Sequence, residues 1–246
     1  MDINKPIISE KDPHKVTIGQ CTLYLGDMRD VIKYIDPVDM ICSDVPYKLT
    51  SGGNTTGEMG GKFSHAEYDN SGELIDCKIE FNDFLPLLFD VLKDPGHAYF
   101  MVNNRNVQLL LNEAENAGFK FHNLLVWDKI SPTPNRWYMK NCEFTGFFYK
   151  GKAKYINECG SRMLVKLPNP RNGYHKTEKP TTLMKHYIEN STKAGDTVID
   201  PFMGSGTTGI AAIRCGRKFI GIEVNKKIFD IACARIEKEQ QQYKLI

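Results

Sequence analysis

A glycine-rich cluster near the C-terminal end is the first feature of this sequence that suits chemistry. The residues TVIDPFMGSGTTG at 197–209 run from a β-prone segment into a glycine turn, and Glu223 ends the next apolar run. The glycines have G-x-G-x-x-G spacing, at Gly204, Gly206 and Gly209. Glycine lets a backbone pass close beneath a ligand, and a strand-end carboxylate accepts hydrogen bonds from ribose hydroxyls. Because the lysine of a Walker phosphate loop is missing, a dinucleotide site and an S-adenosylmethionine site both remain open.

A second cluster, Ser43-Asp44-Val45-Pro46-Tyr47, follows the apolar run at 38–42. The carboxylate of Asp44 and the carbonyl of Val45 can each accept one N–H of an exocyclic amine, while the ring of Tyr47 stacks on a planar base. Two acceptors localise the amine lone pair and direct it toward a sulfonium methyl. An acidic turn with a buried tyrosine is the structural alternative.

The position of the glycine cluster in the chain constrains the sheet. Only 23 residues follow Glu223, enough for one helix but not for further strands. The N-terminal strands must therefore complete the sheet, which places Leu25-Gly26-Asp27 beside Glu223 at the same ligand. The carboxylate of Asp27 would then accept hydrogen bonds from an adenine amino group, unless Gly26-Asp27 is a simple turn.

The elements that must position these clusters alternate between strand and helix. Apolar β-prone runs occur at 21–25, 40–42, 98–102, 124–127, 197–199 and 219–222, and helical spacing occurs at 81–93, 106–117, 181–191, 206–215 and 226–240. Alternation of this kind predicts an α/β fold whose mostly parallel sheet has helices on both faces. The five glycines at 51–62 predict a mobile loop, which is either a lid over the site or a plain surface loop.

Composition excludes several classes of protein. The 246 residues are 41% hydrophobic and 25% charged with a net charge of +2, which excludes a disordered chain, and no apolar run is long enough for a membrane helix. The seven cysteines form no C-x-x-C pair, so we expect neither a metal site nor a disulfide framework. The charged N-terminus does not resemble a secretory signal. We therefore expect a single domain over 1–246 in a reducing cytoplasm.

The charge is unevenly distributed. Residues 131–180 hold ten basic and three acidic side chains, a net of +7 that leaves −5 for the remainder, and eight aromatic residues lie among them. This composition is typical of a surface that contacts phosphates and stacks on bases, although a solvated basic face over core aromatics has the same composition. The stretch 128–178 lacks a clean period, so we expect an insertion upon the sheet rather than part of it.

The motif DVPY at 44–47 and the motif DPFMGSGTT at 200–208, with HKTEKP at 175–180 between them, resemble those of the S-adenosylmethionine-dependent DNA amino-methyltransferases. The resemblance is to the permuted group, in which the catalytic motif precedes the cofactor motif. It extends over about 21–235 and includes LVWDK at 125–129 and the stretch 143–150. It implies a circularly permuted, Rossmann-like methyltransferase fold, S-adenosylmethionine as cofactor, and methyl transfer to a flipped base without a covalent enzyme intermediate.

The resemblance assigns roles residue by residue. It makes the catalytic turn Asp44, Val45, Pro46 and Tyr47. It places at the cofactor Asp27, Met28, Asp44, Thr177, Lys179, Pro180, Asp200, Phe202, Gly204, Ser205, Gly206, Thr207, Glu223 and Val224. Target recognition is expected at about 131–174, with DNA contacts from Arg136, Lys140, Lys150, Lys152, Lys154, Arg162 and Arg171.

The expected reaction is methylation of adenine N6 in double-stranded DNA, because an aspartate at the head of the motif is more typical of adenine enzymes than a serine. Methylation of cytosine N4, a catalytically impaired DNA-binding homologue and, less compatible with DVPY, an NAD dehydrogenase are the alternatives. One position departs from the usual DPPY pattern, since Val45 replaces a proline. The family further suggests a homodimer, and a bacterial or phage-infected cell as the location.

Overall fold

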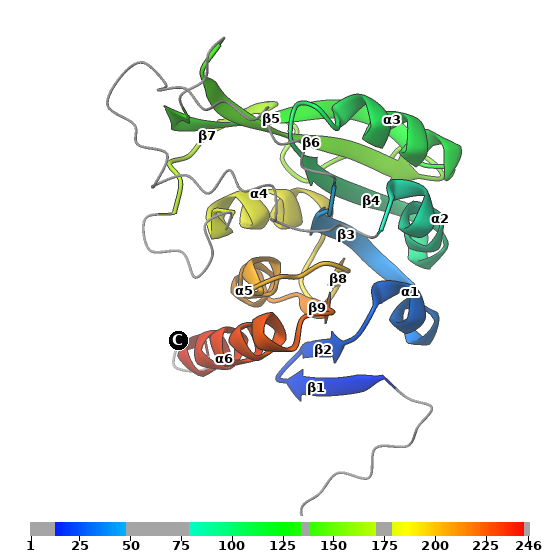
Figure 1. Cartoon of the computed structure of the whole chain (residues 1–246), viewed down its shortest axis with the longest axis vertical. Helices are drawn as coiled ribbons and strands as arrows, with labels where there is room; N and C mark the ends of the chain where they lie inside the picture. Colours follow the sequence, from blue (N-terminus) through cyan, green and yellow to red (C-terminus); the bar gives the residue numbers. More distant parts are fainter. Residues whose placement is uncertain (1–12, 48–78, 134–137, 171–178, 244–246) are drawn as a thin grey trace, which may run out of the picture.

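A nine-stranded sheet runs through the whole molecule in this computed structural model, which describes residues 13–47, 79–133, 138–170 and 179–243 (Figure 1). The strands lie in the order β1-β2-β9-β8-β3-β4-β6-β5-β7. Their bounds are β1 (His14–Ile18), β2 (Cys21–Leu25), β3 (Val38–Asp44), β4 (Leu92–Val102), β5 (Lys120–Thr133), β6 (Lys140–Lys150), β7 (Leu164–Lys166), β8 (Thr197–Asp200) and β9 (Lys218–Glu223). Strands β2, β9, β8, β3 and β4 are parallel neighbours, whereas β1 and β6 run antiparallel to theirs.

Helices cover both faces of the sheet, as Figure 1 shows. One face carries α1 (Met28–Val31), the 3-10 turn η1 (Ile32–Tyr34), α2 (Phe81–Val91) and α3 (Val107–Asn116). The other carries α4 (Thr181–Ser191), α5 (Thr207–Arg214) and α6 (Lys226–Tyr243). Each face has its own apolar core, so the predicted doubly covered α/β sheet is confirmed.

The burial pattern of the elements explains why they form. In α2, Phe81, Phe84, Leu85 and Leu88 recur at helical spacing and are all buried, which gives one apolar stripe against the sheet. Strand β3 has helices on both faces, and its run of residues is therefore almost continuously buried instead of alternating.

The N-terminal strand β2 completes the sheet beside the glycine-loop unit. Leu25 is paired with Glu223 in the parallel β2–β9 ladder, and the amide of Gly26 donates a 3.0 Å hydrogen bond to the carbonyl of Glu223. The prediction that Leu25-Gly26-Asp27 lies beside Glu223 is thereby confirmed. The antiparallel edge strand β1 and the short β7 were outside the sequence-based expectation.

The expectation that 128–178 lies upon the sheet is wrong for 128–133, 140–150 and 164–166, which belong to β5, β6 and β7 of the sheet. Residues 140–150 form β6 inside the sheet, between β4 and β5. Phe147 belongs to the core under α4, and Phe148 belongs to the core under α2 and α3. Because both faces of β6 are covered, its sequence shows no alternation that would identify a strand. Residues 134–137 and 171–174 of the expected insertion lie outside the described residues, as does the glycine loop 51–62.

Among the described residues, no helix is long and apolar enough to cross a membrane.

Candidate active site at the carboxyl edge of the sheet

The turn that carries Asp44 begins at the carboxyl end of β3, where ligands of open α/β sheets bind. Asp44 is paired with Met101 of β4, and the neighbouring β8 leads directly into the glycine loop. The buried hydroxyl of Ser43 donates a 2.7 Å hydrogen bond to Oδ1 of Asp200 at the end of β8. The two motifs, which are 157 residues apart in sequence, are thus joined by side chains in space.

Asp44 is one of four charged side chains that are linked by ion pairs. Nζ of Lys179 lies 2.5 Å from Oδ2 of Asp44 and 3.2 Å from Oε2 of Glu143. The other oxygen of Glu143 forms an ion pair with Lys129. Oδ1 of Asp44 is shielded from solvent and has no hydrogen-bond partner within the described part of the chain. Asp44 therefore retains one unused acceptor at the edge where ligands of open α/β sheets bind.

Burial and charge act on these groups in opposite directions. Burial raises the pKa of Asp44 above its ordinary value, and Lys179 reduces that effect without cancelling it. Burial alone would raise the pKa of Glu143 as well, but Lys179 and Lys129 outweigh it and hold the pKa below the usual range. For Lys179, burial lowers the pKa, whereas Asp44 and Glu143 raise it well above the ordinary value. The ammonium of Lys179 is consequently protonated at neutral pH.

The rest of the turn is packed against the core under α2. Val45 is 1% exposed and Tyr47 packs on the same apolar cluster. Burial and the Asp44 charge raise the pKa of Tyr47 to about 12, so its ring is neutral. A pocket of about 130 Å³ adjoins Pro46 and Tyr47 and is bordered by Phe81 and Leu109. The carboxylate of Asp44 and the aromatic ring of Tyr47 thus belong to one turn at the carboxyl edge of the sheet.

The glycine loop has a backbone conformation that suits glycine, and Arg235 holds it in place. Gly204 and Gly206 both have positive φ, of 51° and 85°, and Gly206 caps the start of α5. A Cβ on Gly204 would meet nothing within 4 Å, which leaves the backbone open to a ligand. Arg235 of α6 donates to the carbonyl of Ser205 at 2.7 Å and to its hydroxyl at 2.6 Å. The loop conformation is therefore fixed by the protein itself.

Two further carboxylates flank the loop. Oε2 of Glu223 accepts a 3.1 Å hydrogen bond from the amide of Gly204, and Oε1 accepts one of 2.8 Å from the amide of Asn225. Burial raises the pKa of Glu223. Asp27 caps α1 and is paired with Arg29 at 2.6 Å, and the hydrogen bond from Arg29 lowers its pKa. Each carboxylate oxygen has two lone pairs, so both residues retain acceptor capacity.

These features fit S-adenosylmethionine. The cofactor combines ribose hydroxyls and an adenine amine with a cationic sulfonium and an ammonium group. Carboxylates at Glu223, Asp27 and Asp44 supply acceptors for such groups, and the exposed backbone at Gly204 supplies a surface for close approach. Among the described residues no group of three His, Cys, Asp or Glu side chains is arranged to hold a metal ion.

The other expected cofactor residues lie around this edge with different degrees of exposure. Asp200 is 3% exposed, and its oxygens accept hydrogen bonds from Ser43, from Thr208 at 2.7 Å and from the amide of Phe202. Asp200 therefore organises the loop from within. The ring of Phe202 packs against Phe84 at 4.9 Å. Three of the remaining expected residues are buried: Met28, Pro180 and Thr207. Val224 is 70% exposed, and Thr177 lies outside the described residues.

The residues expected to contact DNA are divided between the carboxyl ends of the parallel strands and their amino ends. Lys140 is exposed and begins β6 beyond the carboxyl edge. Lys150 pairs with Gly96 at the opposite end, about 17 Å along the strands from Asp44 at 3.3 Å per residue, and its Nζ donates to the carbonyl of Phe89 at 2.6 Å. Lys152 follows it there. Lys154 and Arg162 border a pocket of about 390 Å³ on the α4 side, and Arg136 and Arg171 lie outside the described residues.

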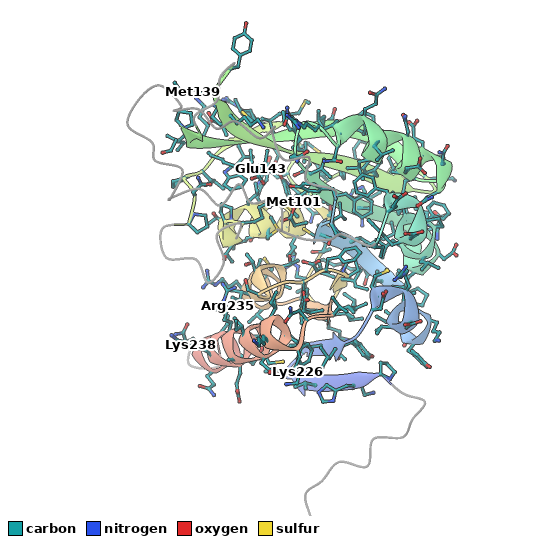
Figure 2. All side chains as sticks on the ribbon, in the orientation of Figure 1. Met101, Met139, Glu143, Lys226, Arg235 and Lys238 are labelled. Atoms are coloured by element: carbon teal, nitrogen blue, oxygen red, sulfur yellow. The ribbon has the colours of Figure 1, made fainter. Side chains whose placement is uncertain are left out.

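The sequence reasoning missed Glu143 and Lys129, which lie on β6 and β5 beside the turn that begins at Asp44. Figure 2 shows Glu143 near Met101, the strand partner of Asp44. Both residues occur in stretches that carried the family resemblance, LVWDK and 143–150, but no role followed from it. A signal was present, because each is a charged residue next to an apolar strand segment.

Comparison with known proteins agrees with this geometry. A family model described as DNA methylase matches residues 38–167 and 161–234. Type II methyltransferase M2.DpnII of Streptococcus pneumoniae is 32% identical over 228 residues, which cover 84% of this chain and 85% of that protein. The structure of the M1.HpyAVI-SAM complex has a TM-score of 0.68 at 26% identity and covers 87% of this chain and 99% of its own.

A third comparison bears on the fold alone. PvuII DNA methyltransferase, described as cytosine-N4-specific, has a TM-score of 0.69 at 20% identity and covers 96% of this chain and 95% of its own. These comparisons confirm the resemblance read from the two motifs, the Rossmann-like methyltransferase fold and the identification as a DNA methyltransferase. The chain belongs to the DNA methylase family of N6 and N4 methyltransferases.

Proposed function

We propose that this protein transfers the methyl group of S-adenosylmethionine to the exocyclic N6 amine of adenine in double-stranded DNA. The carrying observation is Oδ1 of Asp44, a shielded acceptor without a partner among the described residues, next to a glycine loop built for a nucleoside cofactor. The choice of adenine rests on the aspartate that heads the motif. The cofactor is further supported by the M1.HpyAVI-SAM complex.

The chain contributes binding, orientation and acceptor groups to this reaction. S-adenosylmethionine supplies a methyl group that its sulfonium makes electrophilic. Glu223 and Asp27 bind the nucleoside part, and Tyr47 stacks on a base that has left the duplex. Oδ1 of Asp44 and the carbonyl of Val45 accept the two amine hydrogens, which returns the lone pair to the nitrogen. Holding the amine in this orientation lowers the entropic part of the barrier.

Cys42, the described cysteine nearest to Asp44 in sequence, is not a candidate for a covalent nucleophile. Cys42, two residues before Asp44, is 0% exposed, and its Sγ points to Sδ of Met184 at 3.9 Å on the α4 side. Burial raises the pKa of its thiol well above the ordinary value. A neutral, enclosed thiol does not attack a base. Direct transfer to the amine is therefore the mechanism that these residues support.

Nucleoside analysis tests the proposal. Purified protein is incubated with unmethylated DNA and methyl-labelled S-adenosylmethionine, and the DNA is digested to nucleosides. We expect N6-methyldeoxyadenosine. N4-methyldeoxycytidine as the sole product would contradict the choice of adenine. Absence of methylation together with retained cofactor and DNA binding would show a catalytically impaired DNA-binding homologue.

Calorimetry with S-adenosylmethionine and NAD tests the cofactor separately. We expect heat of binding from S-adenosylmethionine only. The expected recognition region has two described parts, residues 131–133 and 138–170, and the second contains the exposed strand start at Lys140 and the segment after β6. Mapping methylated positions in DNA from cells that express the protein would identify the target sequence.

Sedimentation in the presence and absence of DNA tests the expected homodimer.

A further inference from the structure

The four charged side chains at the site come from four separate segments. Asp44 ends β3, Lys179 precedes α4, Glu143 lies on β6 and Lys129 on β5. Lys179 is 8% exposed and lies between the two carboxylates. The set has two positive and two negative charges, so its charges balance. Pairing of this kind is what keeps buried charges from being prohibitively costly.

The contacts of Lys179 argue against the cofactor role that the family resemblance assigned to it. An ammonium has three donor hydrogens, and Asp44 and Glu143 occupy the positions of two of them. The remaining direction is restricted because the side chain is enclosed by protein. Lys179 is thus oriented toward the catalytic carboxylate by a second carboxylate, which Lys129 holds in turn.

We propose that Lys179 and Glu143 are positioning residues that act through Asp44. Glu143, fixed by Lys129, holds the ammonium of Lys179 against Oδ2 of Asp44, so that Oδ1 alone faces the target amine and the basicity of Asp44 is set by the pair. This inference rests on the proposed function, because it concerns the acceptor for the amine in that reaction.

The proton balance of methyl transfer explains what Lys179 and Glu143 contribute to the reaction. When the amine nitrogen forms its new bond to carbon and the carbon–sulfur bond breaks, the nitrogen becomes cationic and must release one proton. Oδ1 of Asp44 is placed to accept that proton, which converts the carboxylate into a neutral acid that later loses the proton to water. Lys179 keeps the carboxylate ionised beforehand, and Glu143 limits how far the ammonium suppresses its basicity.

The two partners have opposite effects on the proton affinity of Asp44. Burial raises the pKa of Asp44, Lys179 and Lys129 lower it, and Glu143 raises it. Among the described residues, Lys179, Glu143 and Lys129 affect the pKa of Asp44. Asp44 in turn affects the pKa values of Tyr47 and Asp200. Removing Lys179 should therefore raise the pKa of Asp44, and removing the charge of Glu143 should lower it.

A carboxyl titration of the cofactor-free protein tests this without reference to activity. The protein is labelled with ¹³C at aspartate carboxyl groups, and the Asp44 resonance is assigned as the one lost in Asp44→Asn. We expect Lys179→Met to move its titration midpoint up, and Glu143→Gln to move it down, each by about one pH unit or more. Lys179→Arg keeps the charge and should titrate near the wild type.

Single-turnover methylation against pH provides the second arm. The acid limb of the rate should shift up in Lys179→Met and down in Glu143→Gln, with the dissociation constant of S-adenosylmethionine changed less than about threefold. Lys185→Met is the matched control, because Lys185 is exposed on α4 and pairs with Glu189 instead. It should leave both the rate and its pH profile unchanged.

The outcomes separate this inference from the proposed function. An inactive wild-type protein would contradict the function, while the titration shifts would still report on the pair. With an active wild type, unshifted midpoints, or shifts in the same direction, would overturn the inference. A tenfold or greater loss of cofactor affinity in Lys179→Met with an unshifted profile would show a cofactor ligand. Because Glu143→Gln is nearly isosteric, it decides the question even if Lys179→Met does not fold.

Discussion

Ser43 donates a 2.7 Å hydrogen bond to Asp200, and this contact joins the turn at Asp44 to the strand that leads into the glycine loop. Both residues are enclosed, with 0% and 3% exposure. Burial raises the pKa of Asp200 to about 6, although Ser43, Thr208 and the amide of Phe202 partly offset it. The junction between the two motifs is therefore sensitive to protonation.

Ser43→Ala should destabilise the protein more at neutral than at acidic pH. The hydroxyl donates to an ionised carboxylate above pH 6, and such a bond contributes about 1.5–3 kcal/mol, compared with about 0.5–1.5 kcal/mol for a neutral pair. Urea unfolding at pH 7.5 and pH 4.5 measures the difference. Equal losses at the two pH values would show that Asp200 does not change its protonation between them.

Asp200→Asn should remove a fall in stability between about pH 4 and pH 6. A raised carboxyl pKa means that the native state binds the proton more tightly than the unfolded state, so the free energy of unfolding decreases as pH rises through this window and is constant above it. The size of the fall is roughly 3 kcal/mol at 1.36 kcal/mol per pKa unit. The quantity to measure is the wild-type stability minus the variant stability, which should decline over this window.

Asp44→Ala should abolish methyl transfer and leave cofactor affinity within a few-fold of the wild type. The variant removes the acceptor for the amine, whereas the nucleoside-binding groups at Glu223 and Asp27 remain. Asp27→Ala is the crossed control and should weaken S-adenosylmethionine binding while the bound complex still reacts. Calorimetry and single-turnover rates measure the two effects. If Asp44→Ala lost binding and transfer equally, Asp44 would be a cofactor ligand first.

Val45→Pro, which restores the usual family residue, should change turnover by less than about tenfold. The carbonyl of residue 45 is present in both proteins, and the expected gain in stiffness is about 0.4–1 kcal/mol, below the 1.4 kcal/mol that corresponds to a factor of ten. Single-turnover rates on the same DNA measure the change. A rise of several orders of magnitude from a near-zero rate would instead identify the natural chain as catalytically degenerate.

Gly206→Ala should weaken cofactor binding more than Gly195→Ala does. Both glycines have φ near 85°, a region that costs an alanine about 1–2 kcal/mol. A Cβ on Gly206 would also lie 3.2 Å from Ile236, whereas one on Gly195 meets nothing within 4 Å. We expect similar backbone costs in urea unfolding, and a tenfold or greater loss of S-adenosylmethionine affinity only for Gly206→Ala. Comparable affinities would place the ligand elsewhere.

Lys140→Ala should reduce the salt dependence of DNA binding, and Lys152→Ala should not. Each phosphate contact contributes about 0.9 to the slope of log affinity against log salt concentration. Lys140 extends past the edge that carries Asp44, while Lys150, Lys152 and Lys154 lie at or near the other edge. Binding titrations at several salt concentrations give the slopes. A reduced slope for Lys152→Ala would mean that DNA reaches the far edge.

The sequence by itself identified the family, the alternation of strands and helices, and the adjacency of β2 and β9, but it did not give the positions of β1, β6 and β7 in the sheet. The two motifs are local, so their resemblance to the motifs of a known family could be recognised without the tertiary structure. The adjacency of β2 and β9 was also predicted from the sequence, and the parallel β2–β9 ladder confirms it. Helical periodicity located α2 to α6 within a few residues, since one apolar stripe per helix faces the core.

Only the tertiary structure decided which charged residues meet Asp44. Lys179 is 135 residues away in sequence, and its distance to Asp44 depends on where α4 begins relative to β3. Glu143 and Lys129 reach the site only because β6 lies between β4 and β5, and a strand buried on both faces leaves no alternating pattern. The same register sends Lys150 to the opposite edge. Local patterns encode what each segment forms, whereas strand register decides what its side chains contact.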